Sequence, residues 1–143
     1  MKIYVFNKQK DLKLSSKSAR AIVRAVIDHE KADFTEVGLY FVSEKKIGEL
    51  HDQFFNDPTP TDCISFPLSF GGEVFVCPKT ALLYADQHQL DPYEEAALYI
   101  VHGLLHLMGY DDLEEKARRI MRKKEKSCMN HLKDLKILLR PPF

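Results

Sequence analysis

Two histidines, His102 and His106, have the residue type and spacing best suited to chemistry. They lie in the longest apolar helical pattern of the chain, and residues four apart on a helix project from the same face. Their imidazoles can therefore bind one metal ion without distortion of the backbone. A lone histidine on an apolar helix is usually a core residue, but two would each need a separate buried partner. The spacing thus favours a metal site over a core role.

A glycine and a carboxylate complete the predicted ligand set. Gly109 lies three residues after His106 and is the residue type that ends helices in the left-handed conformation. Asp112 follows three residues later, so a chain that folds back at the glycine returns a carboxylate to the imidazoles. Three protein ligands leave a fourth position for water, as in catalytic zinc sites. Asp111 is a competing donor for the same place.

Hydrolysis is the reaction class that such a site predicts. A bound divalent ion lowers the pKa of its water to about 7 and polarises phosphoryl or carbonyl oxygens. The metal-bound water is the one catalytic group that we expect, and no side chain stands out as a general base. The spacing is similar to the H-E-x-x-H-x-x-G-x-x-H/D pattern of metzincin-type proteases, but Gly103 replaces the glutamate that serves as their general base. A protease is therefore the weaker alternative.

Three short segments of the chain stand out as motifs. Residues 102–112 read H-G-L-L-H-L-M-G-Y-D-D, residues 60–67 read P-T-D-C-I-S-F-P, and residues 72–76 read G-E-V-F-V. They resemble the H-G-x-L-H-x-x-G-Y-D-H, P-T-D-V-L-S-F-P and G-D-I-x-I motifs of the YbeY family of metal-dependent endoribonucleases. The match spans most of residues 36–125.

The resemblance implies a fold, a cofactor and a substrate. The fold would be a small α+β domain, with a four-stranded mixed sheet, about five helices and a metal site at the end of a buried helix. One zinc ion would be held by His102, His106 and the residue at position 112. The activity would be cleavage of single-stranded RNA in maturation of the 3′ end of small-subunit ribosomal RNA and in ribosome quality control, with ribosomal proteins as further partners.

Two positions depart from the family pattern. Asp112 stands where the family has its third metal-binding histidine, and Phe55 where it has an arginine. A carboxylate cancels one unit of the zinc charge, so the bound water should be less acidic than with three neutral imidazoles. The phenylalanine removes a cation that would pair with the scissile phosphate. These departures keep open a second interpretation, a non-catalytic ribosome-assembly or RNA-binding factor with a structural metal.

Length and composition fit one cytoplasmic domain over residues 1–143. A hydrophobic content of 45% is enough for one core. No apolar run approaches the roughly 20 residues of a membrane span, and the N-terminus lacks the apolar core of a signal peptide, so we expect no membrane contact. The formal net charge of zero argues against a strongly basic nucleic-acid binder. The cysteines fit neither a disulfide framework nor a zinc pattern, so we expect buried apolar roles for Cys63, Cys77 and Cys128.

Hydrophobic periodicity predicts the elements that position the candidate site. Alternating apolar residues predict strands at 2–7, 36–42, 63–66 and 73–77, with the last two joined as a hairpin by a turn at 69–72. Helical spacing and capping residues predict helices at 16–30, 43–54, 78–88, 92–108 and 113–132. The helix at 92–108 is apolar almost all round, so we expect it to be buried and to hold the two histidines rigidly.

The last predicted helix and the loop at 56–62 carry further polar candidates. Residues 116–126 hold seven basic side chains and a single acid, Glu125. This face is either solvated or binds the RNA phosphate backbone. In the loop, Asp62 is favoured as a turn residue, with a role near the metal as the alternative. His51 is expected at the surface or at an edge.

Overall fold

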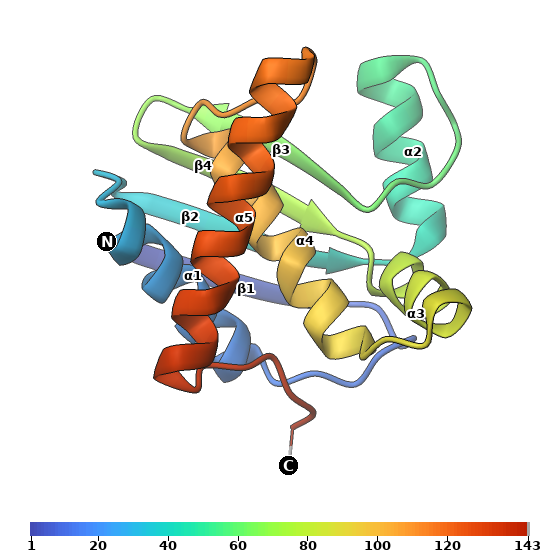
Figure 1. Cartoon of the computed structure of the whole chain (residues 1–143). Coiled ribbons are helices and arrows are strands. Elements are labelled where there is room, and N and C mark those ends of the chain that lie inside the picture. The colour runs from blue at the N-terminus through green and yellow to red at the C-terminus, as the bar shows by residue number, and fades with distance from the viewer. Residues whose placement is uncertain (143) are drawn as a thin grey trace.

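A computed structural model describes residues 1–142 of the chain (Figure 1). The elements in chain order are β1 (Lys2–Lys8), α1 (Ser16–Glu30), β2 (Glu36–Val42), α2 (Glu44–Phe55), β3 (Cys63–Leu68), β4 (Gly71–Val76), α3 (Pro78–His88), α4 (Pro92–Leu107) and α5 (Glu115–Leu135). The sheet has the order β1-β2-β4-β3, in which β1, β2 and β4 are parallel and β3 is antiparallel. The predicted α+β class and four-stranded mixed sheet are confirmed.

Helices α1 and α4 cover one face of the sheet, and α5 crosses over both of them (Figure 1). Residues two apart in a strand share a face, so β2 buries Val37, Leu39 and Phe41 against these helices. Helix α4 lies between the sheet and α5 and is buried on most of its surface, as predicted. Helix α2 lies beside β3 and packs its Ile47 into a smaller apolar cluster.

Helices α1 and α4 begin at side chains that cap their first turns. The side chain of Ser15 accepts the backbone N–H of Ser18 at the start of α1, and Asp91 accepts that of Tyr93 at the start of α4. The predicted start of α5 at Leu113 is wrong by two residues. The N–H of Leu113 is instead bonded to the carboxylate of Asp111, which keeps this part of the chain in the preceding turn.

Strand β3 runs through Pro67, where we had expected it to end. Because β3 is an edge strand with only β4 beside it, the missing N–H of proline can face the open edge. The predicted hairpin of β3 and β4 is confirmed, but its turn is shorter than predicted, since Gly71 and Gly72 already belong to β4. Within residues 1–142, every helix is too short or too polar to cross a membrane.

Candidate metal centre

The two predicted histidines lie one turn apart near the end of α4, with their ring nitrogens facing each other. Nε2 of His106 is 2.9 Å from Nε2 of His102. Asp112 reaches the same place, with its Oδ2 3.6 Å from Nε2 of His102 and 4.0 Å from Nε2 of His106. The structure therefore brings the three predicted residues together, and we call this group the candidate metal centre.

The turn after α4 is what returns Asp112 to the histidines. The helix ends with two bonds, from the N–H of Gly109 to the carbonyl of His106 and from the N–H of Tyr110 to the carbonyl of Leu105. Gly109 has a φ of 100°, and a Cβ added there would meet nothing within 4 Å. The backbone angle, and not a lack of space, therefore requires glycine at this turn.

The neighbouring carboxylate, Asp111, bonds to the backbone of its own loop. It is exposed and accepts the N–H of Leu113 at 3.2 Å, so it shapes the loop. The same loop is tied to α5 by Arg118, which donates to the backbone carbonyl of Asp112 at 3.4 Å. Of the two acids that competed in the sequence, the one nearest the histidines is Asp112.

A buried carboxylate on α5, Glu125, completes the group and was not predicted. It accepts a hydrogen bond from Nδ1 of His102 and is 7% exposed. Since a carboxylate only accepts, Nδ1 must carry the proton, which leaves the lone pair of Nε2 directed at His106 and Asp112. A sequence signal did exist, because Glu125 follows Met121 by four residues and precedes Cys128 by three, on the buried stripe of α5.

The contact between His102 and Glu125 shifts the pKa of both groups. Burial lowers the pKa of His102, but the hydrogen bond and the negative charge of Glu125 outweigh it and raise that pKa above its ordinary value. Burial raises the pKa of Glu125, while the hydrogen bond with His102 and the charges of His102 and Arg122 bring it below its ordinary value. Glu125 is thus a charged group that makes the imidazole more basic and a better donor to a metal.

The donor atoms of the candidate metal centre lie near the spacing that a zinc ion requires. Ligand atoms about 2.0–2.1 Å from a tetrahedral zinc ion lie about 3.3 Å from one another. The three separations of 2.9, 3.6 and 4.0 Å lie around this value. Two imidazoles and a carboxylate are donors that zinc accepts, and three protein donors leave a place for a substrate or water.

Two cavities open beside the candidate metal centre. One, of about 440 Å³, lies between the end of α2, strand β3 and the turn after α4, and is lined by His106 and Asp112. His51 also lines it, with a side chain that is 21% exposed, which agrees with the predicted place at the surface or at an edge. The loop that follows α2 folds back on this helix, and the Thr59 carbonyl lies 2.8 Å from the His51 ring. A cavity at an open coordination position is a natural place for substrate.

The second cavity, of about 710 Å³, meets His102 and Asp112 from the other side. Asp62 lines it, and its carboxylate accepts the backbone N–H of Cys63 at 2.7 Å. The bond to Cys63 fits the predicted turn role of Asp62, while a role near the metal stays a prediction for a side chain in this cavity wall. Arg122 of α5 lines this cavity as well and donates to both carboxylate oxygens of Glu125, at 3.2 and 3.4 Å.

Gly103 gives a steric reason against a metzincin-type protease. A Cβ added at this buried glycine would lie 2.4 Å from a methyl carbon of Val74 and 3.3 Å from the hydroxyl of Ser65. Ser65 donates to the Gly103 carbonyl at 2.8 Å, so α4 rests directly on β3 and β4 here. A glutamate at this position, the general base of those proteases, would not fit.

Comparisons with known proteins agree with the geometry. The sequence model of the family described as Endoribonuclease YbeY matches residues 4–133. Endoribonuclease YbeY of Protochlamydia amoebophila is 52% identical over 142 residues, covering 94% of this chain and 95% of that protein. The Endoribonuclease YbeY of Chlamydia trachomatis serovar D is 36% identical over 149 residues, covering 97% and 92%.

A solved structure shares the fold. The solution structure of TM1509 from Thermotoga maritima matches with a TM-score of 0.67 and 30% identity, covering 91% of this chain and 88% of that protein. The family model and the relatives cover most of the chain, including the segments that build the candidate metal centre. This chain belongs to the YbeY family of endoribonucleases.

Proposed function

We propose that this chain is a metal-dependent endoribonuclease that cleaves single-stranded RNA in ribosomal RNA processing, including maturation of the 3′ end of small-subunit RNA. The observation that carries the proposal is the convergence of His102, His106 and Asp112 beside two cavities, in a chain of the endoribonuclease family. We further propose that the cofactor is one zinc ion, that residues 1–143 act as one domain, and that the protein works in the cytoplasm.

Each residue of the candidate metal centre has a distinct part in this proposal. His102 and His106 would offer neutral nitrogens to the ion and Asp112 an oxygen, while Glu125 orients the ring of His102. When bound, zinc would supply an acidic water and a positive charge for the scissile phosphate. The charge of Asp112 would weaken both effects in comparison with three histidines.

A cation from α5 would compensate for the arginine that Phe55 replaces. Arg122 lies in the cavity wall beside His102 and Asp112, and its side chain is 66% exposed although it contacts Glu125. A guanidinium has five N–H donors, so it can bind Glu125 and a phosphate oxygen together. In this proposal, Arg122 is the part of the basic stretch at 116–126 that binds substrate, and the rest of the stretch is a solvated face.

Phe55 would have a different use in substrate binding. It lines the smaller cavity together with His106 and is 57% exposed. An aromatic ring at the wall of a cavity can stack on an unpaired base, a contact worth about 1–3 kcal/mol in single-strand binders. A preference for single strands would follow, because bases within a duplex are already stacked.

Cleavage of a single-stranded ribosomal RNA fragment by the zinc-loaded chain tests the proposal. We expect His106→Ala to lose cleavage by at least about 100-fold, since it removes a metal donor. His88→Ala is the matched control, because His88 is exposed on α3 and, within residues 1–142, bonds only to its own helix. Equal, background-level rates for wild type and both variants would overturn the nuclease proposal and leave the non-catalytic assembly factor, which the Phe55 departure favours.

A further inference from the structure

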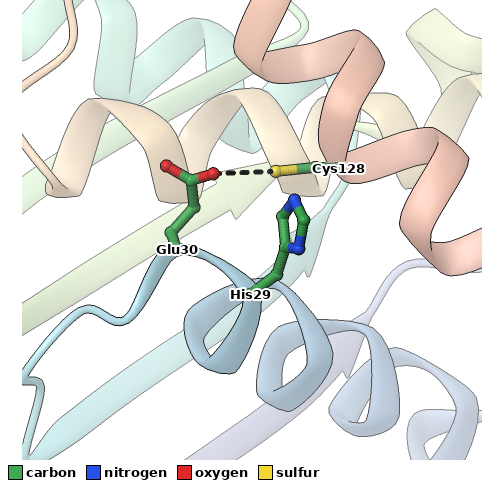
Figure 2. A group of neighbouring side chains, drawn as sticks. All are labelled: His29, Glu30 and Cys128. Carbon is green, nitrogen blue, oxygen red and sulfur yellow. Dashed lines mark hydrogen bonds between the residues drawn. The ribbon is translucent and has the colours of Figure 1, made fainter.

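A second group of metal-binding side chains lies where the end of α1 meets α5. Figure 2 shows His29 and Glu30 at the end of α1, beside Cys128 of α5. One donor atom from each of the three lies within 4.8 Å of the others. We propose that His29, Glu30 and Cys128 form a second metal site, a structural zinc site that joins α1 to α5. We call them the α1–α5 cluster.

The donors of the α1–α5 cluster suit zinc in type and spacing. Thiolate, imidazole and carboxylate are the three kinds of ligand found in protein zinc sites. The sulfur of Cys128 lies 3.9 Å from Oε2 of Glu30. With Zn–S near 2.3 Å and Zn–O near 2.0 Å, two such atoms on a tetrahedral ion lie about 3.5 Å apart. Small side-chain movements would therefore bring both atoms onto one ion.

The two oxygens of Glu30 have different partners, which leaves one of them for a metal. Oε1 is 3.2 Å from the ammonium of Lys124 and accepts the Tyr110 hydroxyl at 3.5 Å. Oε2 has the Cys128 thiol as its partner, and a thiol is a weak donor. The Glu30 side chain is only 7% exposed, so water can do little to compensate. A zinc ion on Oε2 would make a much stronger contact than the thiol does.

His131 would become a fourth ligand only after its ring rotates, because the three donors already together are His29, Glu30 and Cys128. It follows Cys128 by three residues, so both face the same side of α5. Its ring now stacks on that of His29, with centroids 4.2 Å and planes 19° apart, so one of the two rings must turn before both can bind one ion. Four protein donors would close the site to water, as in structural zinc sites. Pairs of ligands from two elements, Cys128 and His131 on α5 with His29 and Glu30 on α1, would hold these helices together.

The protonation of the Cys128 thiol makes metal binding at the α1–α5 cluster dependent on pH. Burial, with the negative charge of Glu30 in second place, raises the pKa of Cys128 to about 12. Any thiol must lose its proton when it binds a metal, so binding should strengthen as the pH rises. In competition with metal, Nε2 of His29 lies 3.0 Å from the hydroxyl of Ser127.

Cobalt binding to the metal-free, full-length chain tests this proposal separately from the nuclease proposal. A thiolate bound to cobalt gives a charge-transfer band in the near ultraviolet, and the candidate metal centre contains no sulfur donor. We expect wild type to bind two ions and to show the band. Cys128→Ser should lose the band and one ion, and His29→Ala, which leaves the buried thiol in place, should weaken cobalt binding at this site at least about tenfold.

Two further variants make the outcome unambiguous. Cys63→Ser should keep the band, because Cys63 lies in the cavity beside His106 and is the other sulfur that a stray ion would meet. His106→Ala should lose one ion and keep the band. A wild-type protein without the band, or a band that persists in Cys128→Ser, would overturn the second site even if RNA cleavage is intact. In that case the α1–α5 cluster is held by its hydrogen bonds alone.

Discussion

The candidate metal centre and the α1–α5 cluster both contact α5, but they are assembled in different ways. The first takes its donors from one helix and the turn after it, within residues 102–112, and opens onto two cavities. The second joins donors that lie 98 positions apart in the chain, and its sulfur is fully buried. Each donor group is also tied to α5, through Glu125 in the first case and through Lys124 in the second.

The contrast separates two uses of the same side-chain chemistry. Donors held by local backbone geometry can leave a coordination position facing a cavity, because the turn and not the ion sets their positions. Donors held by the contact of two distant helices gain most from an ion that closes the contact. We call the candidate metal centre the open site and the α1–α5 cluster the closed site. Removal of metal should abolish catalysis at the open site, whereas at the closed site it should lower the stability of the fold.

The largest effect should come from Asp112→Ala, which removes a donor from the open site alone. Loss of an outer-shell partner typically weakens metal binding about 10- to 100-fold, so loss of a direct donor should weaken zinc binding by more than about 100-fold. Zinc retained after dialysis against a graded chelator measures this. Asp111→Ala is the control, since the Asp111 carboxylate bonds to the backbone of Leu113. Equal zinc retention in the two variants would show that Asp112 is not the third donor.

Glu125→Gln comes next and tests whether α5 supports the open site through charge. The amide keeps the size of the side chain but cannot hold the His102 imidazole as a carboxylate does, so we expect zinc to bind about 10- to 100-fold more weakly. The cobalt–thiolate band of the α1–α5 cluster should not change. Glu115→Gln, an exposed acid at the start of α5, is the matched control. Wild-type zinc affinity in Glu125→Gln would reduce Glu125 to a packing role.

The local part of the candidate metal centre could be predicted from the sequence, and the distant part could not. His106, Gly109 and Asp112 follow from helix geometry and the stereochemistry of glycine, which act within a few residues. Glu125 meets His102 only because α5 crosses α4, and that crossing depends on the whole fold. The helical spacing places Glu125 on the buried stripe of α5, but the spacing gives no partner for it.

The fold divides in the same way. Helix starts were predictable because serine, aspartate and proline act on the first turn, as at Ser15 and Asp91. The predicted strand stops before Pro67, because proline is tolerated in a sheet only on an edge strand. The strand order that makes β3 an edge strand depends on long-range contacts, which the local sequence does not show. The mixed sheet itself followed from the family resemblance.

Gly109→Ala should have a smaller effect and tests the claim that a local turn builds the open site. Alanine at a φ of 100° is strained, and we expect a loss of about 1–2 kcal/mol in the free energy of unfolding, measured by denaturant titration of the metal-free chain. Gly109→Asn should lose less, because asparagine tolerates the left-handed region better. If alanine proved harmless, the turn would be set by contacts of the loop with α5, such as that of Arg118 with the carbonyl of Asp112.

The smallest effect distinguishes two cations of α5 that each contact one carboxylate at 3.2 Å, Arg122 on Glu125 and Lys124 on Glu30. Arg122 lines a cavity of the candidate metal centre, so Arg122→Gln should lower kcat/KM for RNA several-fold and reduce the slope of log affinity against log salt by about 0.7, the value for one phosphate contact on a single strand.

Lys124→Gln should cleave RNA as wild type does, because Lys124 lies over the Tyr110 ring and on Glu30, away from that cavity. It should instead bind cobalt more tightly at the α1–α5 cluster, since the ammonium no longer competes with the ion for the charge of Glu30. Steady-state cleavage at several salt concentrations, together with cobalt titration, measures both effects. An equal loss of cleavage in the two variants would mean that α5 acts through its summed charge, and the open site would then have no phosphate-binding cation of its own.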